Sequence, residues 1–153
     1  MENLESLLEQ HPFVKGLRKE HVRLLSGCTA NARFDEGKFI FRENQVAEHF
    51  YILREGKVAL EIYAPDRGPI VIDTLGAGDI LGWSWLIPPY HWKFDARVIE
   101  GTRALVLDGK CLRKKCEDDH DLGYELLKRF ASIVEQRLEA TRIQLLDIYG
   151  ITS

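Results

Sequence analysis

The sequence predicts a mainly β domain with flanking helices, in which an antiparallel sandwich or jelly roll is followed by one long helix. Short β-rich runs separated by turn signals fill residues 31–108, and many short strands at close spacing are typical of such architectures. Residues 121–149 instead show helical periodicity and contain no proline. Because a chain of 153 residues has the size of one domain, we expect a single unit over residues 1–153.

The strands are expected where β-branched and aromatic residues cluster between glycine-containing turn signals. The β-rich runs are residues 39–41, 50–53, 58–63, 70–72, 80–81, 96–98 and 104–107. The turn signals are residues 36–37, 55–56, 65–68, 76–78 and 100–101. Gly37 and Gly56 stand where tight turns require a positive φ, which glycine adopts without steric cost.

Helices are expected on both sides of the β region. Residues 1–30 hold two short helices, the second over residues 17–25, and residues 109–150 hold a short helix over 110–115 and the long helix over 121–149. One row of the long helix steps alternately by four and three residues, as in the a/d seam of a left-handed coiled coil. This row comprises Leu127, Ala131, Val134, Leu138, Thr141, Leu145 and Ile148. We expect it to form a homodimer interface; the alternative is a helix that only covers its own core.

Composition and charge argue against several classes of function. A formal charge of −3 and a pI near 6.0 supply no concentrated basic face for nucleic acid. No stretch approaches the roughly 20 apolar residues that span a bilayer, and the acidic start at residues 1–5 differs from a signal peptide. We therefore expect a cytoplasmic protein that binds neither nucleic acid nor a membrane directly.

The three cysteines are expected to be reduced. Cys28, Cys111 and Cys116 make an odd number in a chain without an export signal, so no disulfide framework is needed. Cys111 and Cys116 are five residues apart in an expected helical region and do not share a face. No other Cys or His pair completes a metal set, so we expect no metal site.

Three segments carry a resemblance to a known family. They are residues 34–44 (Phe-Asp-Glu-Gly-Lys-Phe-Ile-Phe-Arg-Glu-Asn), 50–58 (Phe-Tyr-Ile-Leu-Arg-Glu-Gly-Lys-Val) and 76–82 (Gly-Ala-Gly-Asp-Ile-Leu-Gly). In order and spacing they resemble the cyclic-nucleotide-binding domain of the catabolite activator and fumarate-nitrate regulator superfamily, and the similarity extends over essentially the whole chain. The resemblance implies an eight-stranded antiparallel β-roll (a double-stranded β-helix), a phosphate-binding cassette and a dimerising helix.

The ligand site implied by this resemblance departs from the family at its chemical anchors. The family places the phosphate and ribose of the ligand at the glycine that corresponds to Gly82. Nucleotide-binding members follow this glycine with a glutamate that bonds the ribose, whereas this chain has Trp83 there. They also begin the next strand with an arginine, whose planar guanidinium pairs with the cyclic phosphate.

Two alignments are possible for the position that corresponds to the family's phosphate-binding arginine. If the alternation of Phe94, Ala96 and Val98 marks the inward-facing positions, Trp92 takes the place and Lys93 follows it. If the preceding loop keeps the length usual in activator proteins, Lys93 takes the place and Phe94 follows it. We prefer the first register, because burial with a period of two fixes strand faces while loop lengths vary. Both registers lack the arginine, so we expect cyclic nucleotide binding to be weak or absent and no other cofactor.

Other polar candidates for ligand contact lie on the strand and on the long helix. Lys93 or Arg97 is a substitute cation, but Arg97 shares an alternating face with Lys93 and Asp95, and we expect that face to be solvated. Thr141 matches the residue that reaches the purine ring in activator proteins, and Arg142 replaces the serine usual after it. Thr141 fits the role of a small interface residue equally well.

The cassette is also rich in aromatic residues. Those rings belong to Trp83, Trp85, Tyr90, His91, Trp92 and Phe94, with Ser84 as a polar neighbour. One interpretation is that they fill a vestigial pocket. The other is that they stack on a planar or apolar effector that is not a cyclic nucleotide.

These observations lead to three hypotheses, none of them enzymatic, because no catalytic triad, phosphate loop or catalytic carboxylate pair is present. The first is a stand-alone sensor domain that binds a small effector and dimerises through its long helix. The second is a ligand-free dimeric interaction module that contacts another protein. The third is the sensory fragment of a transcription regulator whose helix-turn-helix domain is missing. We expect the end after Gly150 to be a natural helix stop.

Overall fold

The computed structural model describes residues 3–150. Its elements are α1 (Leu4–Gln10), α2 (Lys19–Ser26), β1 (Thr29–Phe34), β2 (Phe39–Phe41), β3 (His49–Ala64), β4 (Gly68–Gly76), β5 (Ile80–Leu81), β6 (Asp95–Asp108), α3 (Gly109–Asp118) and α4 (His120–Ile148). The chain divides into two compact units, with the boundary between Lys115 and Cys116. The expected short helices at both ends of the β region and the long terminal helix are confirmed.

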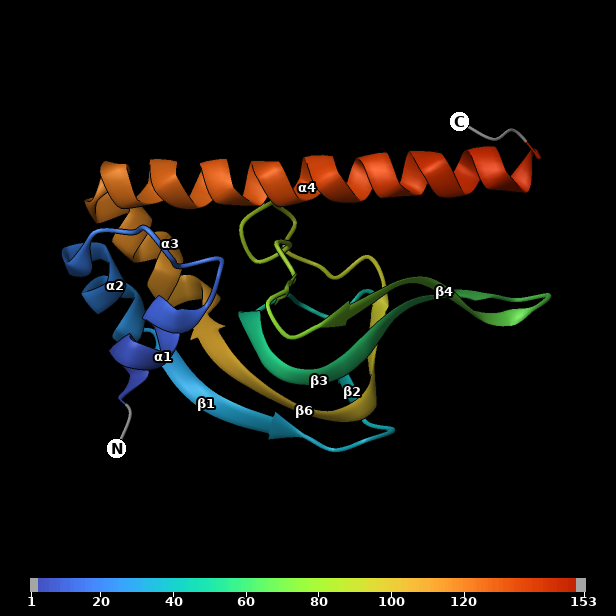
Figure 1. The fold of residues 1–153 in the computed structure, drawn as a ribbon, viewed down its shortest axis with the longest axis horizontal. Coiled ribbons are helices and arrows are strands. Elements are labelled where there is room, and N and C mark those ends of the chain that lie inside the picture. The colour runs from blue at the N-terminus through green and yellow to red at the C-terminus, as the bar shows by residue number, and fades with distance from the viewer. Residues whose placement is uncertain (1–2, 151–153) are drawn as a thin grey trace. The chain divides into compact units, whose positions relative to one another are not determined.

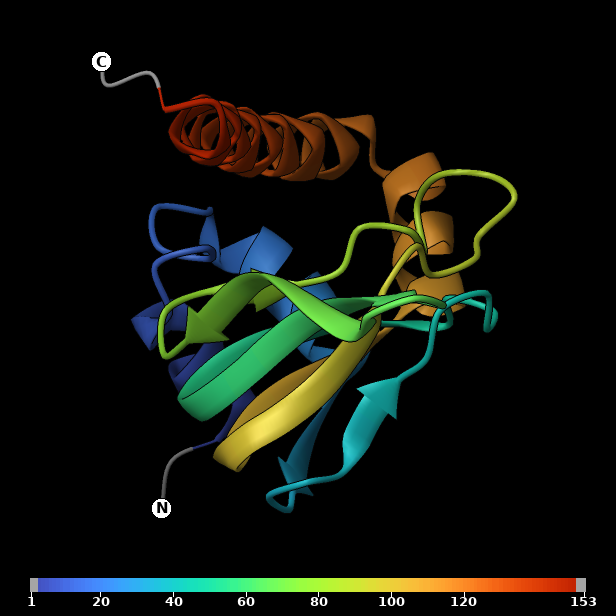
Figure 2. The ribbon, with the colours of Figure 1, turned by 90° about the vertical axis from the view of Figure 1, so that its right-hand side faces the viewer.

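The strands of the first unit form one antiparallel sheet in the order β1-β6-β3-β4, with β2 paired to β6 and β5 paired to β3. The long strands β3 and β6 lie side by side and both curve, which gives the sheet the form of a roll (Figures 1 and 2). The expected β-roll with flanking helices is therefore confirmed. It contains six strands, whereas the resemblance implied eight.

The lower strand number has a local cause, because two expected turns are irregularities within continuous strands. Residues 50–53 and 58–63 join into β3, and residues 96–98 and 104–107 join into β6. The pairing of β3 with β6 shifts register around Gly56, which has φ 101°. A Cβ at Gly56 would lie 2.5 Å from the carbonyl oxygen of Gly101. Gly56 thus permits a close approach of β3 to β6 at a bulge within a continuous strand, rather than a chain reversal.

Strand β1 was missed by the sequence analysis. Its residues, Thr-Ala-Asn-Ala-Arg-Phe, contain few β-formers and show no clear alternation of apolar side chains. The strand exists because all six residues pair antiparallel with β6, from Thr29 opposite Leu107 to Phe34 opposite Thr102. Long-range pairing here overrides weak local propensity.

The second unit contains α4, whose first turn is capped by Asp119. The Asp119 carboxylate accepts a hydrogen bond from the backbone N–H of Leu122 at 3.1 Å, which satisfies one of the free donors at the helix start. Five large apolar side chains of the expected coiled-coil row are exposed: Leu127, Val134, Leu138, Leu145 and Ile148.

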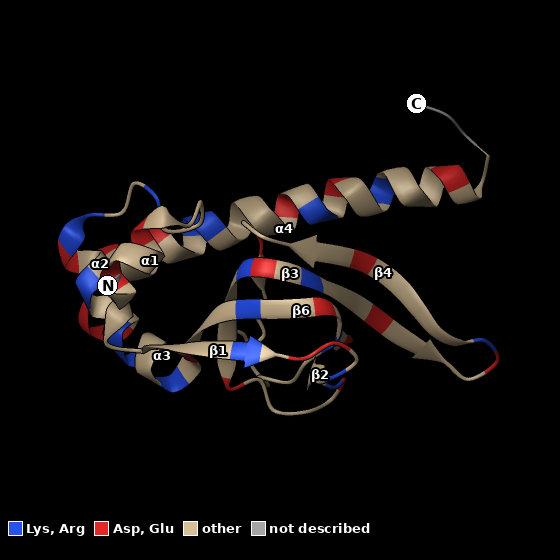
Figure 3. Ribbon diagram, turned by 60° about the horizontal axis from the view of Figure 1, so that its bottom comes forward, with Lys and Arg blue, Asp and Glu red and all other residues tan. Residues whose placement is uncertain are grey.

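Charge is mixed over the described residues. Figure 3 shows Lys and Arg interspersed with Asp and Glu along β3, β6 and α4, so none of these elements presents one sign alone. Between residues 3 and 150, no helix combines the length and apolar character needed to traverse a bilayer.

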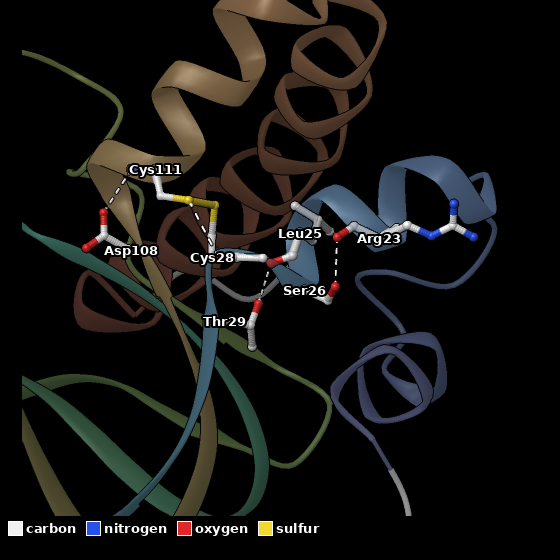
Figure 4. Close-up of a disulfide and its surroundings, with 8 residues drawn as sticks. Arg23, Leu25, Ser26, Cys28, Thr29, Asp108 and Cys111 are labelled. Atoms are coloured by element: carbon white, nitrogen blue, oxygen red, sulfur yellow. Dashed lines mark hydrogen bonds between the residues drawn. A yellow bond between two sulfur atoms is a disulfide. The ribbon is translucent and has the colours of Figure 1, made fainter.

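The expectation of reduced cysteines is wrong for two of them. Cys28, just before β1, forms a disulfide with Cys111, in the first turn of α3, and their Cα atoms are 5.7 Å apart (Figure 4). The two positions are 83 residues apart in the sequence. They meet because β1 pairs with the end of β6, and the sequence spacing gives no sign of that pairing. Cys116 is free and half-buried.

Candidate functional site

The cassette begins where β5 ends, at Gly82. Its backbone takes φ 92°, and a turn follows in which the N–H of Leu86 donates to the carbonyl of Trp83 at 3.0 Å. A single turn is therefore present over residues 84–86. Trp83 and Ser84 are half-buried on this turn, and Trp85 is fully buried.

The ring of Trp92 lies directly on Gly82. A Cβ built at Gly82 would lie 2.3 Å from the indole, closer than any side chain tolerates. On β2, the ring of Phe41 stacks on the same indole with centroids 3.8 Å apart and planes 7° apart. Trp92 is only 2% exposed. The resemblance places the phosphate and ribose of a ligand at Gly82. The indole of Trp92 therefore occupies the space where that ligand was expected.

The backbone of Trp92 is fixed as firmly as its ring. Its N–H donates to the carbonyl of Gln45 at 2.9 Å, and its carbonyl accepts from the N–H of Asn44 at 2.8 Å. Asn44 takes a positive φ of 73°, which asparagine tolerates better than most residues. The N–H of Ala47 also donates to the carbonyl of Tyr90 at 2.6 Å. These bonds join the end of the cassette to the loop after β2.

Trp85 anchors the turn after Gly82 in the hydrophobic core. Its indole is 0% exposed and lies 6.0 Å from the ring of Phe50 on β3. On α3, Arg113 donates a hydrogen bond to the carbonyl of Trp85, and its guanidinium lies 4.5 Å from the ring centroid of Tyr90. One side chain of α3 therefore contacts the cassette at two places, Trp85 and Tyr90.

Of the three positions expected to face inward, two lie on β6 and are buried there. Ala96 and Val98 are fully buried, Phe94 is half-buried with its ring 5.7 Å from that of Phe41, and Lys93 is exposed. This burial pattern is the one on which the preferred register rests. The assignment of Trp92 to the arginine place stays a prediction.

The face of β6 that carries Asp95 was expected to be solvated, and for Asp95 this is wrong. The carboxylate is buried and accepts hydrogen bonds from the backbone N–H of Glu43 at 2.7 Å and from Nε of Arg42 at 3.4 Å. The loop after β2 covers this position, and the strand's own alternation could not reveal that cover.

Arg97 forms an ion pair with the buried carboxylate of Glu61. Its guanidinium donates to both carboxylate oxygens of Glu61, with Nη2 2.7 Å from Oε2. These hydrogen bonds raise the pKa of Arg97 above its usual value. Glu61 is 3% exposed, so the arginine serves as the charge partner of a carboxylate that would be costly to bury alone. A phosphate would have to share this cation with Glu61.

The cassette wall also includes a phenol that stays neutral. Tyr51 lies on β3, with its ring centroid 6.1 Å from that of Phe41. Burial, assisted by the negative charge of Glu48, raises the pKa of Tyr51 to about 12. The aromatic cluster around Trp92 therefore carries no charge of its own near neutral pH.

A separate cavity of about 320 Å³ lies outside the cassette, lined by Leu7, Gln10, His11, Pro12, Leu53, Arg54, Glu55 and Gly78. The N–H of Phe13 donates to Nδ1 of His11 at 3.1 Å, so Nε2 carries the proton that it shares with the carbonyl of Leu53 at 3.0 Å. Burial lowers the pKa of His11. This cavity contains none of the predicted site residues.

The two candidates on the long helix make local interactions. The hydroxyl of Thr141 donates to the carbonyl of Arg137 at 2.8 Å, and Nη2 of Arg142 lies 2.6 Å from Oε1 of Glu139. Both belong to the second unit, whereas the other candidates belong to the first.

Sequence analysis missed three residues that shape this site. Phe41 belongs to the first of the three family-like segments, but only the structure shows that it stacks on Trp92. Arg113 and Glu61 carry no sequence signal, because their partners are 28 and 36 residues away. Over the described part of the chain, no cluster of His, Cys, Asp and Glu suitable for a metal ion is found.

Comparison with known proteins identifies relatives of this fold. A family model described as the cyclic nucleotide-binding domain matches residues 32–119. The chain is similar to the CRP-like cAMP-activated global transcriptional regulator of Mycobacterium tuberculosis, with 23% identity over 145 residues that cover 95% of this chain and 63% of the regulator. The chain thus spans less than two thirds of that relative's length.

Solved structures show the same architecture. A protein from Geobacter metallireducens GS-15, named for cyclic nucleotide binding, superposes with a TM-score of 0.79 and 30% identity, covering 90% of this chain and 99% of that one. A mutant of the regulatory subunit of a cAMP-independent protein kinase A from Trypanosoma brucei, with cAMP bound in its A site, superposes with a TM-score of 0.73 and 21% identity, covering 90% of this chain and 48% of that one.

Proposed function

Because this chain belongs to the cyclic nucleotide-binding domain family, we propose that it is a regulatory domain of that type which acts without a cyclic nucleotide in its roll. The observation that carries the proposal is the position of Trp92. Its indole lies on Gly82 and stacks on Phe41, so the domain supplies from its own chain the group that fills the cassette.

The charges around the cassette support the same conclusion. A cyclic phosphate taken out of water needs a cation with hydrogen bonds, and without one it costs several kcal/mol. Arg97 is already paired with Glu61, and the buried carboxylate of Asp95 lies two residues before it on β6. Lys93 is exposed. Neither Arg97 nor Lys93 therefore offers a buried cation that is available to a cyclic phosphate.

Such a domain acts on a partner through self-association along α4. The row that includes Leu138 and Leu145 is exposed, with Leu138 68% and Leu145 52% accessible, and its spacing matches a two-helix seam. A second copy of the same helix offers the complementary row by symmetry. We therefore propose a homodimer that presents a fixed surface to a protein partner. The mixed charges of Figure 3 fit a protein partner better than nucleic acid.

A sensor for a planar effector that is not a nucleotide is the second candidate. Trp83 and Phe94 remain partly accessible beside the buried stack, and such rings are common in sites for planar ligands. A ligand-dependent rise in unfolding temperature separates this sensor from the ligand-free module, because only a ligand that binds the folded state stabilises it.

The cyclic nucleotide claim is tested by calorimetric titration of cyclic AMP and cyclic GMP, followed in parallel by tryptophan fluorescence. We expect no heat of binding and no spectral change. Micromolar binding of either nucleotide would overturn the proposal, since it would require Trp92 to leave Gly82.

The dimer is tested by sedimentation equilibrium on two variants of α4. Leu138→Glu places a charge in the seam and is expected to yield monomers, whereas Gln136→Glu places the same charge at an f position and is expected to leave the dimer intact. A monomeric unmodified chain, or equal dissociation in both variants, would contradict this assignment.

A further inference from the structure

The disulfide connects the N-terminal helices to the helix that holds the cassette. Cys28 follows α2, and Cys111 lies in the first turn of α3 (Figure 4). Two residues later on the same helix, Arg113 donates to the carbonyl of Trp85 and covers the ring of Tyr90. The covalent link and the contact to the cassette thus share less than one helical turn.

The two cysteines are held together by more than their own bond. The N–H of Asp108 donates to the carbonyl of Cys28 at 2.9 Å, and the N–H of Gly109 donates to the carbonyl of Glu48 at 2.8 Å. Thr29 pairs with Leu107 next to them. Because these contacts do not depend on the sulfur atoms, a reduced pair would stay within reach of re-oxidation.

The two sulfur atoms differ in access and surroundings. Cys28 is 7% exposed, whereas Cys111 is half-buried. Cys111 lies at the N-terminus of α3, and its N–H is capped by the Asp108 carboxylate at 2.8 Å. Because Cys111 is the more accessible of the two, it is the sulfur that an external reagent meets.

We propose that Cys28 and Cys111 form a reversible redox pair that responds to low-molecular-weight disulfides and sets how firmly α3 holds the aromatic cassette. The Cys111 thiolate attacks one sulfur of glutathione disulfide and releases one glutathione thiolate. The Cys28 thiolate then attacks Sγ of Cys111 and releases the second glutathione. Two protein thiols are thereby oxidised, one glutathione disulfide is reduced to two glutathione thiolates, and the two thiol protons pass to solvent or to those thiolates.

This inference does not depend on any ligand in the roll. In the oxidised state the start of α3 is fixed to the start of β1, which keeps Arg113 against Trp85 and Tyr90. In the reduced state only non-covalent contacts remain at this point. The cassette then opens more often, because local opening follows the loss of constraints on the elements that cover it.

The chemistry is tested on the full chain equilibrated with reduced glutathione and glutathione disulfide at varied ratios, then denatured, alkylated and analysed by mass spectrometry. We expect Cys28 and Cys111 to gain and lose alkylation together and reversibly. Cys116→Ser, which removes the free thiol and leaves the pair, is the matched control and should titrate in the same way. Alkylation of both cysteines at every ratio, or a persistent glutathione adduct on Cys111, would overturn the proposal.

The coupling is tested by hydrogen–deuterium exchange over residues 83–91 in the oxidised and the reduced chain. We expect severalfold faster exchange after reduction. Arg113→Met should retain the redox titration but lose most of this difference, because it removes the contact to the cassette. Equal exchange in both redox states of the unmodified chain would overturn the coupling. The comparison uses one chain in two redox states, so it does not depend on whether a cysteine variant folds.

Discussion

The indole of Trp92 lies so close to Gly82 that a Cβ at position 82 would be 2.3 Å from the ring. Two residues from different ends of the cassette therefore define one packed contact. The glycine permits a φ of 92° and, at the same time, leaves room for a bulky indole. The stability of the cassette should depend on this contact.

Gly82→Ala tests the contact with Trp92. The substitution places a methyl group inside the indole and requires a left-handed backbone for alanine. Gly68→Ala is a matched control, because Gly68 also has a positive φ of 81° but no atom lies within 4 Å of the point that its methyl group would take. Backbone strain of about 1–2 kcal/mol is common to both variants. We expect Gly82→Ala to lose about 1–3 kcal/mol more, from overpacking, as measured by urea unfolding. Equal losses would contradict the packing.

Arg97→Met tests the buried ion pair. It leaves the Glu61 carboxylate, whose side chain is 4% exposed, without a charge partner. Arg103→Met on the same strand removes the partner of Glu55, but both of those side chains are more than half exposed. Since the side chain of Arg97 is itself 36% exposed, we expect a loss of about 2 kcal/mol. For Arg103→Met we expect less than about 1 kcal/mol. Similar losses in urea unfolding would show that Glu61 is not buried with Arg97.

The pH dependence of stability reports on His11. Burial lowers the pKa of His11 in the folded chain, while hydrogen bonds to the carbonyls of Leu53 and Asp79 oppose that effect in part. Between the lowered pKa and the ordinary value of about 6.5, the unfolded chain binds a proton that the folded chain does not. The free energy of unfolding is therefore highest above that value and falls as the pH is lowered through this window.

His11→Gln removes the titrating group and retains a side chain that can donate to the carbonyl of Leu53. As the pH is lowered below about 6.5, we expect the unfolding free energy of the unmodified chain to fall more steeply than that of the variant, by up to about 1.4 kcal/mol per pH unit. Identical slopes in urea unfolding at a series of pH values would show that His11 is protonated equally in both states.

The sequence predicted the elements whose signals are local. Helical spacing identified α2 and α4, and β-rich runs located β2, β4 and β5. It failed where structure arises from distant pairing. β1 exists through its ladder with β6, and the bulge at Gly56 depends on the approach of Gly101. The link between Cys28 and Cys111 follows from that same β1 ladder.

The candidate site was predicted in part for the same reason. The burial of Ala96 and Val98 follows from the pattern of one strand and was predicted correctly, whereas the burial of Asp95 was not. The stacking of Phe41 on Trp92 and the pairing of Arg97 with Glu61 join separate segments of the chain. No periodicity within one segment contains that information, so the engagement of Arg97 became evident only in three dimensions.

The central claim, that Trp92 occupies the cassette in place of a cyclic nucleotide, is tested most directly by the three indole N–H signals in a two-dimensional ¹H–¹⁵N NMR spectrum. Single Trp→Phe variants at positions 83, 85 and 92 assign the signals, and cyclic AMP is then titrated into the unmodified protein. The account predicts that the Trp92 signal keeps its position at every concentration of cyclic AMP. A saturable shift of that signal would show that the nucleotide reaches Gly82 and would contradict the account.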